Sequence, residues 1–151
     1  MKTERLKRFA LCSEAKEWMK SQKNATEAWN NCERGDWMLW IAKKLNVDDR
    51  KLTMAKAMCA KQVEYLMKDQ RSKDALQACI DYFNGLISRE QLNAAAATAY
   101  ATAASYAADA AAAYADDANA YATRTNSLKQ SADICREYLT EEVMAKYRRL
   151  R

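Results

Sequence analysis

The chain reads NAAAATAYATAASYAADAAAAYADDANAYA over residues 93–122, an alanine-rich run punctuated by tyrosine. Alanine is the strongest helix former, and this run holds no glycine or proline that would break a helix. Its start is also marked, because Ser88 and Gln91 have the spacing of a capping box and Gly85 is typical of the end of a preceding helix. The stretch Ser88–Thr123 therefore predicts a long helix around which the rest of the chain packs.

The length of this stretch argues for a bend or a break. One straight helix over 88–123 would extend about 54 Å, whereas a compact domain of this size has a radius of gyration of about 15 Å. A turn is best placed at the polar run Thr123–Ser127, with Asp116–Asn119 as the alternative. The sequence is compatible with either one bent helix or a pair of helices over 88–123.

Composition favours an all-α fold. The 151 residues include two glycines and no proline, and half of them are hydrophobic, which indicates helices with tight connections in a single domain over 1–151. We expect a compact bundle of about seven helices around the Ala/Tyr-rich helix or helix pair. The other expected helices are one over 1–21, one capped by Asn24 and ended by Gly35, and Trp37–Leu45 capped by Asp36. A further helix is capped by Asp48 or Asp49 and runs to about Lys68, and the next is capped by Ser72 and ends at Asn84. After the alanine run we expect a helix with Leu128, Ala132, Cys135 and Leu139 on one face, and a last short helix capped by Thr140.

Core positions follow from helical spacing. In the first helix we expect Leu6, Ala10, Trp18 and Met19 to face inward. Between Asp48 and Lys68 the buried face is expected to include Leu52, Ala55, Cys59, Val63 and Leu66, widened by Met54, Met58 and Tyr65.

The charge balance and the cysteines bear on partners and compartment. The formal charge is +5, and all of it falls in residues 1–90, with 18 Lys and Arg against 13 Asp and Glu, while residues 91–151 hold seven of each. Five cysteines without a C-x-x-C pair, and a charged N-terminus without an apolar signal region, predict reduced thiols and a cytoplasmic protein. We expect no membrane span.

Groups that carry catalysis are scarce. The chain has no histidine, which removes the commonest general base and the commonest zinc ligand. Asp109, Asp116 and Asp117 could bind a cation across a bend, or they could solvate the outer face of the alanine helix. We expect no metal, no cofactor and no enzymatic activity.

Two regions are candidate partner-binding or ligand-binding surfaces. All four tryptophans lie within residues 18–40, either as the aromatic core of this half or as interface anchors. Beside them, Arg34 and Asp36 could read a partner or form a surface ion pair. The candidate site residues are Arg34, Asp36, Trp37 and Trp40 in this region, and Tyr100, Asp109, Tyr114, Asp116 and Asp117 along the alanine run.

Basic residues also gather at both ends of the chain. If the ends lie close together, they would form a patch for phosphates or for an acidic protein; the C-terminal cluster also suits the dipole of a helix end. The two clusters are Lys2, Arg5, Lys7 and Arg8, and Lys146, Arg148, Arg149 and Arg151.

Several motifs resemble a known family. These are Cys12-x-x-Ala15-x-x-Trp18, Ala28-Trp29-x-x-Cys32-x-Arg34-Gly35-Asp36-Trp37-Met38-Leu39-Trp40, Cys59-Ala60, Arg71-Ser72-x-Asp74-Ala75, Tyr82-x-Asn84-Gly85-x-Ile87-Ser88 and Ile134-Cys135-Arg136. Over residues 12–139 the chain resembles the Ala-rich, helical, Imm-like immunity proteins of polymorphic-toxin loci, which phages also carry. The resemblance implies a protein that binds and silences a toxin, and it brings neither a cofactor nor assigned binding residues.

Three hypotheses of function follow. The first is a non-enzymatic inhibitor whose surface, near 34–40 or near Asp109–Asp117, occludes a toxin or effector protein. The second is a phage anti-defence protein that blocks a host nuclease or effector, or sequesters a signalling nucleotide between Tyr, Trp and Arg side chains. The third is a nucleic-acid-binding accessory factor that uses the basic ends. Each is compatible with a monomer or a homo-oligomer.

Overall fold

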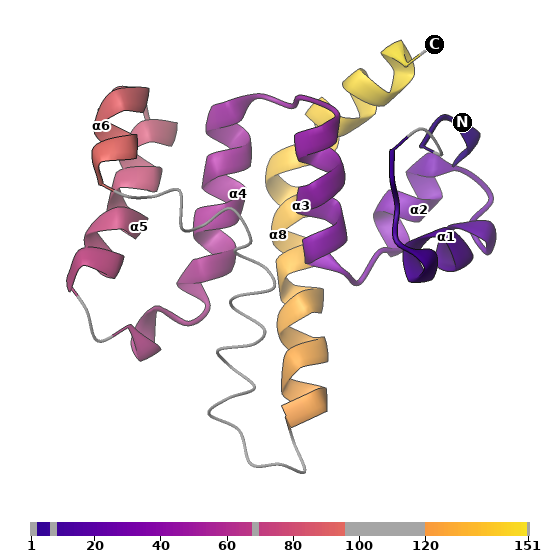
Figure 1. Cartoon of the computed structure of the whole chain (residues 1–151), viewed down its shortest axis with the longest axis horizontal. Coiled ribbons are helices and arrows are strands. Elements are labelled where there is room, and N and C mark those ends of the chain that lie inside the picture. The colour runs from indigo at the N-terminus through magenta and orange to yellow at the C-terminus, as the bar shows by residue number, and fades with distance from the viewer. Residues whose placement is uncertain (1–2, 7–8, 68–69, 96–119, 151) are drawn as a thin grey trace.

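A computed structural model describes residues 3–6, 9–67, 70–95 and 120–150, and it places no β-strand among them (Figure 1). The predicted all-α fold with about seven helices is confirmed, since these residues hold seven α-helices and two short 3₁₀ helices. Their bounds are η1 Thr3–Leu6, α1 Ser13–Lys20, α2 Ala25–Asn31, α3 Gly35–Lys44, α4 Asp49–Lys61, η2 Glu64–Leu66, α5 Gln70–Phe83, α6 Arg89–Ala94 and α8 Ala120–Arg149.

The long helix α8 is the centre of the described packing. It contacts α3, α4 and α2, while α5 packs on α4 and α6 packs on α5. In Figure 1, α5 and α6 lie at one end of the molecule, α1 and α2 lie at the other, and α3, α4 and α8 stand between them. The central role expected of the alanine run concerns residues 96–119 above all, and these lie outside the described residues.

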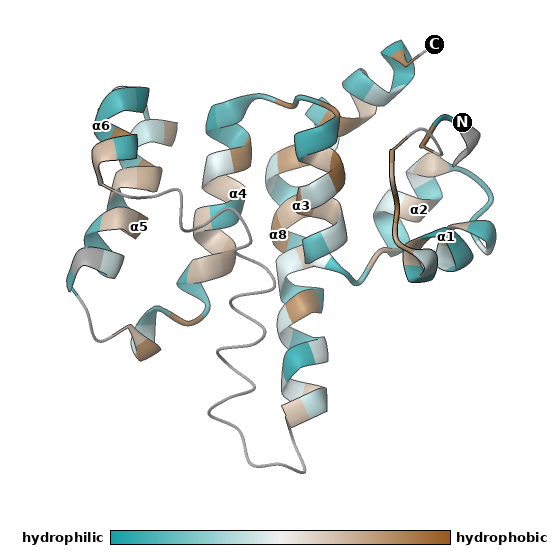
Figure 2. Ribbon diagram, viewed as in Figure 1, coloured by the Kyte–Doolittle hydropathy of each residue, from teal (hydrophilic) through white to brown (hydrophobic). Residues whose placement is uncertain are grey.

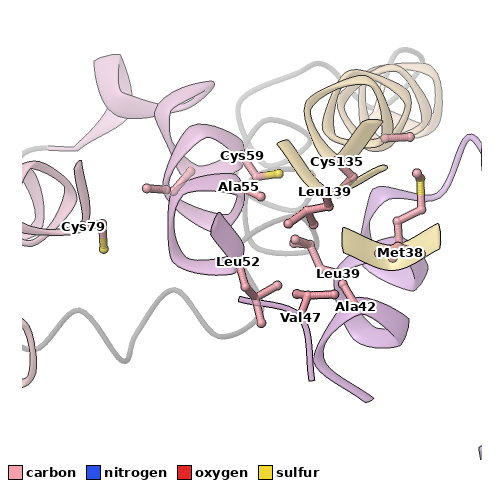
Figure 3. Packing of buried hydrophobic residues seen from close by; sticks show 14 of the residues in the cluster. Met38, Leu39, Ala42, Val47, Leu52, Ala55, Cys59, Cys79, Cys135 and Leu139 are labelled. Atoms are coloured by element: carbon pink, nitrogen blue, oxygen red, sulfur yellow. The ribbon is translucent and has the colours of Figure 1, made fainter. Parts of the chain in front are cut away.

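The core forms where α3, α4 and α8 meet. Apolar residues lie along α3 and the adjacent part of α8 (Figure 2). Leu39, Leu52 and Leu139 converge between the three helices, and Cys59 of α4 lies near Cys135 of α8 (Figure 3). Small residues let the helix backbones approach closely here. The fully buried members of this cluster are Ala42, Ala55, Ala57, Cys59, Ala60, Ala132, Cys135 and Leu139.

Helix α8 runs without the break that we expected at Thr123–Ser127, and Thr140 does not cap a separate last helix. The hydroxyl groups of Thr125, Ser127 and Thr140 form hydrogen bonds within α8 or with α4. Thr125 Oγ1 donates to the Tyr121 carbonyl oxygen at 2.9 Å, and Thr140 Oγ1 donates to that of Arg136 at 2.6 Å. Ser127 is buried and donates to Gln62 of α4. Polar side chains here pair with neighbouring groups, so the helix continues.

The stretch Ser88–Thr123 does not form one straight helix. The capping box of Ser88 and Gln91 is present as predicted, but the helix that it starts ends at Ala94. The Ala95 N–H donates to the carbonyl oxygen of Leu92 as well as to that of Gln91, which closes the last turn. The alternative turn at Asp116–Asn119 lies outside the described residues.

Local caps are predicted well, and glycine roles only in part. The Asn24 and Asp48 side chains accept from the backbone N–H groups of Glu27 and Lys51 and cap α2 and α4. Gly85 follows α5 with a φ of 75°, the left-handed conformation that glycine favours. Ser72 lies inside α5, which begins at Gln70.

The predicted roles of Gly35 and Asp36 are wrong. Helix α2 ends at Asn31, Gly35 is the first residue of α3, and Arg34 occupies the N-cap position that we assigned to Asp36. Gly35 is needed for a close approach: a Cβ built on it would lie 2.4 Å from Ser131 Cβ and 2.6 Å from the Ser131 carbonyl carbon. No side chain fits there, so α3 can lie against α8 only because this residue is glycine.

The first expected helix is also shorter than predicted. Residues 9–12 separate η1 from α1, and Ala10 is exposed, whereas Leu6 is buried as expected. Likewise α4 ends at Lys61 and is followed by η2, which leaves Tyr65 76% exposed. Helical spacing alone thus extended both predicted helices past their true ends, although Val63, which follows α4, is buried as expected.

Candidate functional site

Arg34 and Asp36 form a two-pronged ion pair at the start of α3. Arg34 Nε donates to Asp36 Oδ1 at 2.9 Å and Arg34 Nη2 donates to Asp36 Oδ2 at 2.8 Å. Arg34 Nη1 also donates to Glu14 of α1 at 3.2 Å. The hydrogen bonds to Asp36, helped by the charge of Glu14, raise the pKa of the Arg34 guanidinium. This arginine is thus committed to two carboxylates and ties α3 to α1.

Trp37 lies beneath this ion pair. The guanidinium carbon of Arg34 is 4.4 Å from the centroid of the Trp37 ring, a cation–π distance. The Trp18 ring is 6.0 Å from that of Trp37, centroid to centroid, at an interplanar angle of 60°. The structure therefore brings Arg34, Asp36 and Trp37 together, as the sequence hypothesis requires, and adds Glu14 and Trp18 to them.

Trp40, the fourth candidate of this region, has a different environment. It is half-buried, and Lys44 Nζ lies 5.5 Å from its ring centroid. It does not line the cavity described below. The other five candidates, Tyr100, Asp109, Tyr114, Asp116 and Asp117, lie outside the described residues.

An apolar cavity of about 70 Å³ opens beside Trp37, between α1, α2, α3 and the C-terminal part of α8. Three tryptophans line it, one from each of the first three helices: Trp18, Trp29 and Trp37. We call it the tryptophan cavity. Its other lining residues are Leu6, Leu11, Ala15, Met19, Ala25, Ala28, Cys32, Met38, Ile41, Leu45, Val143, Met144 and Tyr147.

The tryptophan cavity suits a small apolar group. None of the described residues that line it carries a charge at neutral pH, and the polar tip of one lining ring is already engaged: Trp29 Nε1 donates to Thr140 Oγ1 at 2.9 Å. Small-molecule sites are usually 300–1,000 Å³, so about 70 Å³ is too small for a nucleotide. It can take part of an aliphatic or aromatic side chain.

The two ends of the described chain meet next to this cavity. Leu6, Ala25 and Tyr147 form a second buried cluster, against which Leu150 and Phe9 pack, and Figure 1 shows both termini at the same end of the molecule. Arg5 lies close enough to Tyr147 to lower the pKa of its hydroxyl, although burial raises that pKa more. The condition that we set for a terminal basic patch, proximity of the two ends, is met for Arg5 and the end of α8.

A second cluster, which sequence reasoning did not single out, surrounds Tyr82 at the junction of α4, α5 and α6. The Tyr82 hydroxyl donates to Asp49 Oδ2 at 2.8 Å, and Arg89 Nη1 pairs with the same oxygen at 2.9 Å. The guanidinium carbons of Arg50 and Arg89 lie 4.3 and 5.6 Å from the Tyr82 ring centroid. Arg50 Nη1 also donates to the Tyr82 carbonyl oxygen.

Two lysines extend this cluster. Lys56 follows Asp49 by two helical turns on α4 and is half-buried. Burial lowers its pKa, and the positive charges of Lys43 and Arg89 lower it further, against the opposing effect of Asp49. The four cations, Arg50 and Arg89 with these two lysines, come from α3, α4 and α6, of which α3 and α4 follow one another directly in the chain. Only the tendency of basic residues to concentrate in residues 1–90 could have hinted at them.

Neither a metal site nor a membrane span is present within the part of the chain that the structure describes. No group of three or more Cys, Asp or Glu side chains among these residues is placed to hold a metal ion. Nor is any helix within residues 3–6, 9–67, 70–95 and 120–150 both long and apolar enough to cross a membrane.

The chain was also compared with known proteins. Comparisons with protein-family models, with curated proteins and with solved structures gave no match. The likeness to the immunity proteins therefore stays a prediction from the motifs, and the geometry of the two clusters is the basis for a functional proposal.

Proposed function

We propose that this protein is a non-enzymatic binding protein that neutralises a toxin or effector protein. The observation that carries the proposal is the tryptophan cavity, an apolar opening lined by three tryptophans beside the Arg34–Asp36 ion pair. Tryptophan and arginine are enriched among residues that dominate the energy of protein interfaces, and such residues gather in pockets. The absence of histidine from the sequence supports a role without catalysis.

The proposed contact has an apolar anchor and a polar rim. An apolar side chain of the partner enters the tryptophan cavity and packs against Trp18, Met19 and Trp37, which are half-buried in the free protein. Glu14 is 71% exposed at the side chain and bound to Arg34, so it is available for a basic group of the partner at the rim. Burial of the anchor supplies affinity, and the rim supplies orientation.

The test fills the cavity without removing a core residue. Ala15 lines it from α1 and is 5% exposed, so Ala15→Leu places extra atoms in the space that the partner would occupy. Ala94→Leu is the matched control, because it makes the same change at an exposed position of α6. Each variant is co-expressed with the toxin or nuclease genes of its own locus, and growth is measured.

We expect the wild type and Ala94→Leu to restore growth against one of these genes, and Ala15→Leu to fail while remaining folded by circular dichroism. Purified proteins should show at least a tenfold loss of affinity for that toxin in Ala15→Leu alone. Full rescue by Ala15→Leu would exclude the cavity as the contact. Failure of the wild type against every such gene would exclude the immunity role, and rescue against a host defence effector instead would favour the anti-defence role.

A further inference from the structure

We propose that the tryptophan cavity selects a branched aliphatic group, and that the partner anchors itself there with the side chain of a leucine. The leucine of a partner rests on the function proposed above, whereas the preference of the cavity for such a group does not. Three features of the cavity carry the inference: its volume, the chemistry of its buried walls and the fixed position of its rings.

The first feature is the volume. The cavity measures about 70 Å³, whereas an apolar cavity of about 150 Å³ takes up benzene, a ring of six carbon atoms. In proportion, the tryptophan cavity has room for about three carbon atoms. A whole aromatic ring is too large for it, and the isopropyl end of a leucine has the right size. A methylene group separates this branch from the leucine backbone, so the backbone of the partner can stay outside.

The second feature is that polar atoms of the buried walls are already bonded. Trp29 Nε1 donates to Thr140 Oγ1 at 2.9 Å, and Cys32 Sγ donates to a backbone carbonyl oxygen at 3.5 Å. Among the residues that the structure describes, no buried side-chain nitrogen or oxygen atom lacks a hydrogen-bond partner. A water molecule needs roughly two to four polar partners, and a polar side chain would lose its hydration here. The walls therefore favour a guest made of carbon and hydrogen alone.

The third feature is that the aromatic walls are held by contacts of their own. The Trp37 ring centroid lies 4.4 Å from the guanidinium carbon of Arg34 and 6.0 Å from the Trp18 ring centroid. Trp29 is 5% exposed and is fixed by its bond to Thr140. A guest larger than the cavity would have to displace these rings, which lowers its affinity.

Met19 is the adjustable part of the wall. It lines the cavity from α1 and is half-buried, and its unbranched side chain can change conformation more readily than the rings can. Met19→Ala should enlarge the cavity. This variant tests whether volume decides the choice of guest, because it should favour a larger group without closing the site.

The experiment titrates the ¹⁵N-labelled protein with small alcohols and follows the tryptophan indole N–H signals by two-dimensional NMR. Isobutanol carries the side chain of leucine, n-butanol is its unbranched isomer, and benzyl alcohol carries the side chain of phenylalanine. Trp40 does not line the cavity, so its signal, identified with Trp40→Phe, is an internal control for general effects of alcohol. Ala15→Leu fills the cavity, and Ala94→Leu is the matched control at an exposed position.

We expect isobutanol to shift the Trp18, Trp29 and Trp37 signals saturably in the wild type and in Ala94→Leu. Benzyl alcohol should bind at least fivefold more weakly, because its ring exceeds the cavity, and n-butanol at least twofold more weakly. Ala15→Leu should lose the saturable shifts. Met19→Ala should bind benzyl alcohol at least fivefold more tightly than the wild type does.

The wild type alone can overturn the proposal, whatever the fate of the variants. It is overturned if isobutanol gives no saturable shift, if Trp40 shifts as much as the other three, or if benzyl alcohol binds as tightly as isobutanol. Preference for isobutanol together with failure of toxin rescue supports the aliphatic selectivity and overturns the leucine of a toxin as its occupant. Toxin rescue that Ala15→Leu blocks, together with tighter binding of benzyl alcohol, overturns this inference and leaves the proposed function standing.

Discussion

At the scale of single residues, Gly35 fixes how closely two central helices pack. The space that its missing side chain would take is filled by Ser131 of α8, and Cys135 one turn further donates from Sγ to the Gly35 carbonyl oxygen at 3.7 Å. Ser131 in turn accepts from Gln62 Nε2 of α4 at 2.7 Å. One glycine thus sets the spacing at which α3, α8 and α4 make their contacts.

Gly35→Ala should lower the free energy of unfolding by about 3 kcal/mol, because the added methyl group overlaps backbone and side chain of α8 and neither can move freely. Urea denaturation measures the loss. Gly85→Ala is the control: nothing lies within 4 Å of the place that its added methyl group would take, and its φ of 75° should cost only about 1 kcal/mol. A smaller loss at Gly35 than at Gly85 would contradict the close approach.

Residue roles could be predicted from the sequence where the partners are near neighbours. The caps at Asn24, Asp48 and Ser88 depend on residues three positions away, and all three are present. Gly35 was expected to end a helix. Its actual role could not be predicted, because the residue that it packs against, Ser131, lies in a distant part of the chain. Steric constraints of this kind leave no local pattern to read.

At the scale of elements, α2 depends on α8 for the end of its helix. Within the described residues, α2 has no basic side chain in its last turn. Arg136 of α8 donates instead, from Nη1 to the carbonyl oxygens of Trp29, Asn30 and Cys32 at 3.2, 3.2 and 2.8 Å. Its other amino group donates to Asp133 at 2.7 Å, which holds the guanidinium in position.

Arg136→Met should lower the free energy of unfolding by about 2–3 kcal/mol, since it leaves partly buried carbonyl groups without a charged donor. Arg136→Lys should recover only part of this loss, because an ammonium group cannot reproduce the planar set of donors. Lys129→Met, which breaks the exposed pair with Glu33 on the same helix surface, is the control and should leave the urea midpoint almost unchanged. Equal stability of Arg136→Met and Lys129→Met would show that Arg136 does not cap α2.

The existence of the helices was predictable, and their ends were less so. Scarce glycine and proline indicate helices, but helical spacing continued the first helix and the α4 helix beyond their ends. In α8 the error was the opposite one, since the helix continues where we expected a break. Thr125 and Ser127 suggest a turn by composition, yet Ser127 donates a hydrogen bond to Gln62 of another helix. The acceptors and donors that decide such cases come from elsewhere in the fold.

At the scale of the whole molecule, the first and last described elements, η1 and α8, pack against each other. Leu6 of η1 packs with Tyr147 of α8, and this cluster adjoins the tryptophan cavity. From the sequence, a basic patch was expected only if the two ends of the chain lie close together. The sequence could not show whether they do, because the pattern within each helix does not fix the path of the chain. For the same reason the cluster around Tyr82, built from α4, α5 and α6, was missed.

Leu6→Ala should therefore lower the free energy of unfolding by about 2 kcal/mol, as expected for a buried leucine near the edge of a core. Leu86→Ala is the matched control, since Leu86 is 72% exposed and should change stability by less than about 0.5 kcal/mol. Thermal and urea unfolding measure both variants. No difference between them would mean that η1 adds nothing to the packing at the end of α8.

The uneven accessibility of the thiols has a practical consequence. Cys12 is exposed, while Cys32, Cys59, Cys79 and Cys135 are buried, and together they make up the five cysteines of the chain. Cys12 immediately follows Leu11, which lines the tryptophan cavity. A maleimide dye added to the native protein should consequently react at Cys12 alone, at the edge of the tryptophan cavity. A change in its fluorescence can then report binding of a partner there, without any mutation.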